Sequence, residues 1–272
     1  MISCQMASRF IETETTFVPL FNQLNFIAMD IFTNAVPVWV SALFLVSMFV
    51  PAVSIANIIK NTSVKIGMDT AQTNRNRNGV LVFYSLFFMY AITLSITGFL
   101  SVNTLPPRVL LFTTLPLIIF YFGVVFRSKI FWIFLKQIPL ATLIRIHIFR
   151  FVGVFFLIAY FYGALPKTFA LIAGFGDIFT AFTAIFVAYW AEYKKPKYKI
   201  IVLIWNIIGF WDIISVLVTA LLVTKNAIEF QSSQDVSTIA SNPFVLIPAF
   251  APATIIFLHI AIFKKLNQSE TQ

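Results

Sequence analysis

The chain has 272 residues, of which 60% are hydrophobic and only 11% are charged, and its formal net charge is +9. Because soluble domains usually carry about 25% charged residues, this composition excludes an ordinary soluble protein. The basic residues fall in short segments between apolar runs, which favours membrane topology over nucleic-acid binding as the origin of the charge. We expect the lipid bilayer as the main partner, and no nucleic acid. The single cysteine, Cys4, excludes an intrachain disulfide and a cysteine metal cluster.

The first 35 residues are polar and lack the basic and apolar parts of a secretory signal peptide. We expect residues 1–35 to stay attached as an extracytoplasmic tail, with residues 17–32 lying along the membrane surface. Seven apolar runs follow, each close to the roughly 20 residues that a helix needs to cross the hydrocarbon core. They predict an all-α bundle of seven transmembrane helices in a domain of residues 36–263, over residues 36–59, 80–100, 109–126, 144–164, 168–189, 200–223 and 244–263. Residues 264–272 then form a cytoplasmic tail.

The distribution of basic residues tests this count independently. Of the 19 lysines and arginines, all except Arg9, Arg108, Lys167 and Lys225 fall in alternate loops, in the C-terminal tail, or just inside the fourth run. Cytoplasmic loops are enriched in Lys and Arg, so the pattern predicts seven crossings with the N-terminus outside and the C-terminus in the cytoplasm. In one basic loop, residues 127–138 mix aromatic and basic side chains, which predicts a short helix in the inner headgroup layer.

Two aspartates stand out in the apolar runs. A charge at the centre of a membrane helix costs about 2.5–3.5 kcal/mol on insertion scales, so it marks a candidate functional position. Asp177 and Asp212 lie near the middle of the fifth and sixth runs, at nearly the same expected depth. Asp177 falls in a stripe of small residues, which favours a face turned into the bundle. The pair either forms a midplane binding site or merely ties two helices together by hydrogen bonds.

Further polar residues are expected in the inner half of the bundle. Arg150 lies just inside the fourth run, where its side chain can reach the headgroups or turn toward the aspartates. In the seventh run, Pro248 and Pro252 each remove a backbone donor, which leaves the carbonyls of Phe244 and Pro248 without helical partners. His259 follows this kink on nearly the same face. The candidate ligand-binding or proton-binding residues are Asp177, Asp212, Asn206, Arg150 and His259.

These residues favour a small transporter, or a proton-coupled or cation-coupled membrane protein, whose ligand is a small ion or small molecule. A second hypothesis is a sensor or receptor with seven helices that signals through a separate partner. A third is a redox protein in which His147 and His259 hold haem. No hydrolytic triad, zinc-binding helix motif or phosphate-binding loop is present, so we assign no catalytic residue and no metal site, and the cofactor stays open.

The C-terminal half, from about Pro139 to Lys265, contains several short motifs. They are Leu165-Pro166, Ala173-Gly174-Phe175-Gly176-Asp177, Trp205-Asn206 with Gly209 and Asp212, and the prolines 243, 248 and 252 with His259. In this combination the segment resembles an uncharacterised family of bacterial multi-pass membrane proteins. The resemblance implies a bacterial inner-membrane location and a shared polar centre, and it brings no established activity. The N-terminal half carries no such signature.

Overall fold

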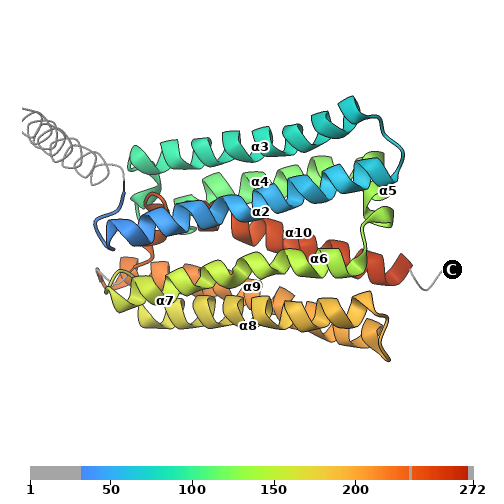
Figure 1. Ribbon diagram of the computed structural model, residues 1–272. Helices are drawn as coiled ribbons and strands as arrows, with labels where there is room; N and C mark the ends of the chain where they lie inside the picture. The colour runs from blue at the N-terminus through green and yellow to red at the C-terminus, as the bar shows by residue number, and fades with distance from the viewer. Residues whose placement is uncertain (1–31, 233–234, 269–272) are drawn as a thin grey trace, which may run out of the picture.

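The structure is a computed structural model, and it describes residues 32–232 and 235–268. Within these ranges every regular element is a helix and there is no strand, so the all-α prediction is confirmed. Most of the predicted N-terminal tail, including Cys4, lies outside the described residues. In Figure 1 the described chain starts at one end of an elongated bundle and finishes at the other end.

The long helices run alternately up and down the bundle (Figure 1). The elements are α2 (Val38–Lys65), α3 (Thr70–Ile96), η1 (Phe99–Ser101), η2 (Leu110–Thr114), α4 (Leu115–Phe120), η3 (Tyr121–Val125), α5 (Lys129–Gln137), α6 (Leu140–Ile146), η4 (His147–Gly153), α7 (Val154–Phe161), α8 (Lys167–Glu192), α9 (Tyr198–Glu229), η5 (Ser237–Ala240) and α10 (Leu246–Gln268). Six helical stretches of the described residues are long and apolar enough to cross a membrane. A seventh becomes available if Leu110–Val125 is counted together with α5, to which it is bent by 90°.

Helix winding departs from the ideal α form in two of the predicted runs. The third run is wound as π-helix in η2 and η3, with only one and a half turns of α-helix between them. The fourth run contains a 3₁₀ stretch, η4, between α6 and α7. Short stretches of either kind inside a helix often coincide with hinges or functional positions. Apolar length predicts that a helix is present but carries no information on its winding.

Several helices extend beyond their apolar runs. α3 begins ten residues before the predicted start at Val80, because the side chain of Asp69 accepts a hydrogen bond from the backbone nitrogen of Gln72 at 2.7 Å and caps the helix. α9 continues six residues past Val223. An apolar run measures the part of a helix that suits hydrocarbon, whereas caps and turns decide where the helix ends.

The short helix predicted at residues 127–138 is present as α5. Its last carbonyl groups accept hydrogen bonds from lysines at the ends of two long helices. Lys65 of α2 donates to Gln137 at 3.0 Å, and Lys265 of α10 donates to Leu135 at 2.8 Å and to Lys136 at 2.6 Å. Cations at a helix C-terminus satisfy its free carbonyl groups and complement its dipole. α5 is therefore fixed across the end of the bundle that carries the basic loops.

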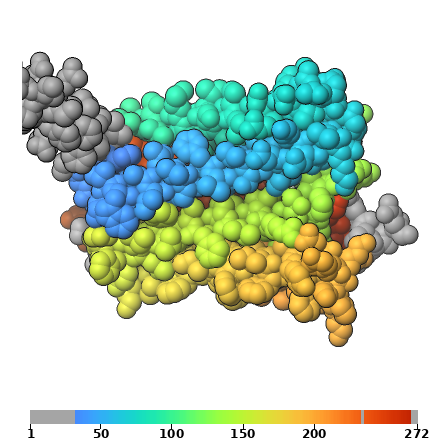
Figure 2. All heavy atoms as spheres, viewed as in Figure 1, coloured from blue at the N-terminus to red at the C-terminus, as the bar shows by residue number. Residues whose placement is uncertain are grey.

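α10 is the most enclosed of the six long helical stretches, and the space-filling view shows it almost covered on this face (Figure 2). Pro252 cannot donate to the carbonyl of Pro248, as the sequence predicts. The hydroxyl of Thr114 in η2 donates to this carbonyl instead, at 2.5 Å. The carbonyl of Phe244 likewise has no helical partner, and it accepts instead from the backbone nitrogen of Ile247 at 2.9 Å in a turn before α10.

Replacing Thr114 by valine removes this donor and leaves a buried carbonyl unpaired, which costs about 1–3 kcal/mol. We expect the purified T114V protein to unfold at a lower temperature than the unmodified protein in the same detergent. The matched control is T113V, because the hydroxyl of Thr113 bonds only to Val109 of the same helical stretch. Equal melting temperatures for the two variants would contradict the assigned role of Thr114.

Candidate functional site

Arg150 is fully buried near the middle of the bundle and joins three helical elements. Its Nε donates to Asp177 Oδ1 of α8 at 2.7 Å, and its Nη2 donates to Asp212 Oδ2 of α9. Its Nη1 donates to the carbonyl of Gly209 at 3.3 Å. Of the two orientations that the sequence left open, the side chain therefore turns toward the aspartates. The two carboxylates meet through one guanidinium, and we call these three residues the Arg150 triad.

The Arg150 triad has an unequal charge. One guanidinium, which stays protonated, faces two carboxylates, so the fully ionised triad has a net charge of −1. Its side chains are shielded from solvent, with exposed fractions of 0% for Arg150, 6% for Asp177 and 15% for Asp212. Buried charges are stable only when they are paired and hydrogen-bonded. In the fully ionised triad, one carboxylate charge is therefore not balanced by Arg150.

Glycines allow the three elements to approach so closely. A Cβ atom added to Gly153 of η4 would lie 2.5 Å from Cβ of Asp177, and one added to Gly176 of α8 would overlap the carboxylate of Asp212. The predicted stripe of small residues on α8 is buried, in agreement with its expected direction. Close helix approach at small residues is how membrane helices associate. The glycines thus place the carboxylates within reach of Arg150.

Asn206 and His259 form a two-point hydrogen-bonded pair between α9 and α10. Asn206 Nδ2 donates to the backbone carbonyl of His259 at 3.0 Å, which fixes the orientation of the amide. Asn206 Oδ1 then lies 2.8 Å from His259 Nδ1, so Nδ1 carries the proton and donates. In the neutral ring this leaves Nε2 as an acceptor, and this buried atom has no partner among the described residues.

His147 lies against this pair. Its ring centroid is 4.3 Å from that of His259 and 5.3 Å from that of Trp205. The ring is fully buried, and neither of its nitrogens has a hydrogen-bond partner in the described part of the chain. A haem plane does not fit between two imidazoles in such close contact, so the geometry does not support a haem held between His147 and His259.

The two groups of polar residues meet at Gly209. A Cβ atom added there would lie 2.7 Å from Cε1 of His259, so the imidazole packs directly on the glycine. The carbonyl of the same glycine accepts from Arg150. The structure thus brings all five predicted site residues into one contiguous polar column: Arg150, Asp177, Asp212, Asn206 and His259.

From the sequence, His147 was considered only as a haem ligand and was not included among the candidate ligand-binding or proton-binding residues. The roles of Gly153 and Gly176 were also missed, although Gly153 follows Arg150 by three residues and Gly176 precedes Asp177. The sequence did contain a signal for these two positions: a glycine close to a charged residue inside an apolar run. Such a glycine permits the close approach of another helix.

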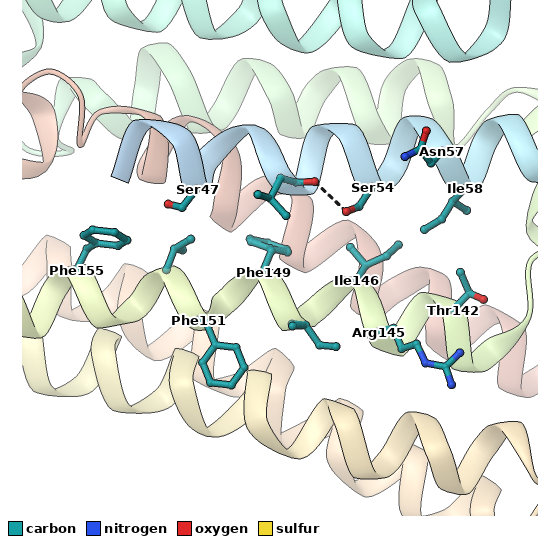
Figure 3. Close-up of a pocket in the computed structure, with 13 residues that line it drawn as sticks. Ser47, Ser54, Asn57, Ile58, Thr142, Arg145, Ile146, Phe149, Phe151 and Phe155 are labelled. Carbon is teal, nitrogen blue, oxygen red and sulfur yellow. Dashed lines mark hydrogen bonds between the residues drawn. The ribbon is translucent and has the colours of Figure 1, made fainter. Parts of the chain in front are cut away.

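Two large hollows lie among the described residues, and the Arg150 triad lines neither of them. The first is a groove of about 720 Å³ between α2 and the α6–η4–α7 stretch (Figure 3). Two of its polar side chains are already engaged, since Ser54 donates to the carbonyl of Val50 at 2.8 Å and Arg145 forms an ion pair with Glu192. The second hollow shares Ile58 of α2 and Ile146 of α6 with the groove and extends from there toward α3 and α10. The triad is therefore closed to both hollows in this conformation.

The family described as a domain of unknown function (DUF8737) matches residues 106–267, more than half of the chain. The match begins at residue 106, whereas the sequence resemblance begins at about Pro139. It contains the Arg150 triad and also Asn206, His147 and His259. Comparison with curated proteins and with solved structures gives no match.

Replacing Gly176 by alanine places a methyl group where the carboxylate of Asp212 lies. The carboxylate or the helix must shift, and overpacking of this kind costs about 1–3 kcal/mol. We expect a lower melting temperature for G176A, measured in detergent. Gly79 of α3 is the matched control, because an added Cβ atom there meets open space and alanine favours a helix. A melting temperature for G176A at or above that of G79A would show that the close approach is not required.

Proposed function

The chain belongs to the family described as a domain of unknown function (DUF8737), and because this description names no activity we propose one from the site. We propose that the protein is a small transporter coupled to protons or to a monovalent cation, with the Arg150 triad as its binding site. The observation that carries this proposal is the unequal charge of the buried triad.

The charge argument leads to a definite occupant. Two carboxylates and one guanidinium leave one negative charge in a low-dielectric centre, and an unpaired charge there is costly. A proton on one carboxyl group, or one bound monovalent cation, removes the imbalance. Asp212 is the more exposed of the two acids, so we assign it as the group that exchanges the proton. Asp177 keeps the Arg150 side chain in place.

The polar column supplies a route between the triad and the basic end of the bundle. His147 precedes Arg150 by one 3₁₀ turn, Asn206 precedes Asp212, and His259 lies in the second half of α10. All three residues thus lie on the side of the triad that faces the basic loops. The free ring nitrogens of His147 and His259 can accept and release protons. We propose that protons reach the triad along these groups.

Transport also requires the site to open alternately to each side. η4 carries both His147 and Arg150, and its 3₁₀ winding in mid-helix is typical of a hinge. We propose that movement of η4 exposes Asp212. We also propose seven crossings of a bacterial inner membrane with the N-terminus outside, on the alternation of basic loops and the sequence resemblance. The bent pair formed by Leu110–Val125 and α5 then supplies the seventh crossing.

A sensor is the second candidate. The proposed hinge, η4, carries His147 and contacts the two aspartates through Arg150, so a change in the charge of these groups would move η4. A sensor would signal through a separate partner and carry no flux. Measurement of flux therefore separates the two functions.

In vesicles that contain the purified protein and a pH-sensitive dye, we expect proton uptake when a potassium diffusion potential is applied. Asp212→Asn should reduce the initial rate at least about tenfold, since an amide cannot exchange a proton. Asp235→Asn is the matched control, because Asp235 bonds to Asn103 and to the backbone of Ser237 in connecting segments, outside the triad. Equal rates for D212N and the unmodified protein would refute the assignment, and no flux in either would favour the sensor.

Infrared difference spectroscopy tests the charge count itself. The unmodified protein should show one carboxylic-acid band from the triad, and the band should weaken if a bound cation replaces the proton. In Asp177→Asn one carboxylate faces one guanidinium, so both ionise and the band should disappear. In Arg150→Gln, two carboxylates are left without their cation, and we expect the band to strengthen. A band that is unchanged in both variants would contradict the charge argument.

A further inference from the structure

The second hollow is a cavity of about 730 Å³ that lies apart from the Arg150 triad. It is enclosed by α2, α3, the α4–η3 stretch, α5, α6 and α10. Sites for small organic ligands in proteins usually measure about 300–1,000 Å³, so the cavity has the volume of a ligand site.

The cavity walls are mostly apolar and include seven aromatic residues. Phe83 of α3 stacks on Phe120 of α4 with ring centroids 4.4 Å apart, and Phe257 of α10 lies 4.7 Å from Tyr121 and 5.3 Å from Phe131. These rings all line the cavity. Such a lining favours the binding of hydrocarbon and offers no partner to a charged group.

Three buried hydroxyl groups close the deep end. The hydroxyl of Tyr84 lies 2.8 Å from that of Tyr121, which lies 2.9 Å from the hydroxyl of Thr254. Buried hydroxyls require hydrogen-bond partners, and these three supply one another. The hydroxyl groups of the deep wall therefore need no polar group from a ligand, and the aromatic rings of this wall remain available for apolar contact.

The mouth differs from the interior. At the basic end, Gln72 and Arg75 of α3 are exposed and line the cavity beside Ser128. Along the flank, Val124 is 58% exposed and Ile130 is 60% exposed, so the cavity is open to the side as well. Among the described residues that line the cavity, Arg75 is thus the only charged one, and it lies at the end with the polar side chains.

We propose that this cavity binds one acyl chain of an anionic phospholipid, with the phosphate at Arg75. Arg pairs with phosphate through two parallel hydrogen bonds, and basic residues at the inner surface attract anionic headgroups. Tyr84 follows Arg75 by nine positions in α3, which corresponds to about 13.5 Å along the helix. A bilayer core about 30 Å thick gives each leaflet about 15 Å of chain, so the depth of the cavity matches one chain. The second chain stays outside the lateral opening.

The groove of Figure 3 does not share this chemistry. Its arginine, Arg145, is paired with Glu192, so it offers no free cation to a headgroup. The cavity between α3 and α10 is therefore the better lipid site, and it is independent of the proposed transport activity.

The proposal is tested by identifying which lipid stays bound to the purified protein. The protein is reconstituted into vesicles of equal parts phosphatidylglycerol and phosphatidylcholine, extracted with a mild detergent and weighed intact by native mass spectrometry. The unmodified protein should keep one phosphatidylglycerol. In Arg75→Gln the preference for phosphatidylglycerol over phosphatidylcholine should fall about fivefold, the contribution of one basic residue near the surface. Gly79→Phe should reduce binding of both lipids, because it fills the mouth.

Two matched variants control for charge and for size. Arg77→Gln removes a neighbouring arginine of α3 that bonds to Asn57 and Asn78 and does not line the cavity. Gly123→Phe adds the same ring at an exposed position of η3 outside the cavity. Both should retain lipid like the unmodified protein. An added Cβ atom at Gly79 meets open space, so the plug variant keeps its fold. The proposal is overturned if the unmodified protein keeps no lipid, if its retained mass is that of a free fatty acid, or if R75Q and R77Q lose lipid equally.

Discussion

A guanidinium group at the centre of an apolar bundle is the constraint on which the rest of the structure depends. Arg150 cannot lose its proton, so the surrounding chain has to supply compensating groups within hydrogen-bonding distance. Asp177 and Asp212 supply the charge, and the carbonyl of Gly209 supplies a further acceptor. To bring these groups together, η4, α8 and α9 must lie closer than ordinary side chains permit. The glycines at the contacts are the result of this requirement.

Much of this arrangement could be predicted from the sequence, because the cost of a charge in hydrocarbon is large and does not depend on fold. That cost identified Asp177 and Asp212, and helical periodicity placed Asn206 on the same side as Asp212. The direction of Arg150 could not be predicted, since both the headgroups and the aspartates lay within reach of its long side chain. The approximate depth of Arg150 in the bundle and its face of the helix could be estimated from the sequence. Its side-chain rotamer could not, because the rotamer depends on neighbouring helices whose positions the sequence does not give.

Other features were not predictable for a different reason. The Thr114 bond to Pro248 joins η2 to α10, two segments far apart in the sequence, so helical spacing could not predict it. The hydroxyl trio of Tyr84, Tyr121 and Thr254 joins three separate helices, and no spacing within one helix reveals it. A lone tyrosine in an apolar run was the available signal, because its hydroxyl needs a partner wherever it is buried. α10 contributes to both regions of the molecule: His259 belongs to the polar column, whereas Thr254 lines the cavity.

The 3₁₀ stretch has a geometrical consequence for the residues it carries. With three residues per turn, His147, Arg150 and Gly153 lie in single file along one edge of η4. An α-helix advances about 100° per residue where a 3₁₀-helix advances about 120°, so rewinding η4 would turn each of these residues about 60° away from the one before it. The rise per residue would also fall from about 2.0 Å to about 1.5 Å, which shortens the seven residues by about 3.5 Å. A change of η4 from 3₁₀-helix to α-helix would therefore shorten the stretch and rotate its arginine, Arg150, about the helix axis at the same time.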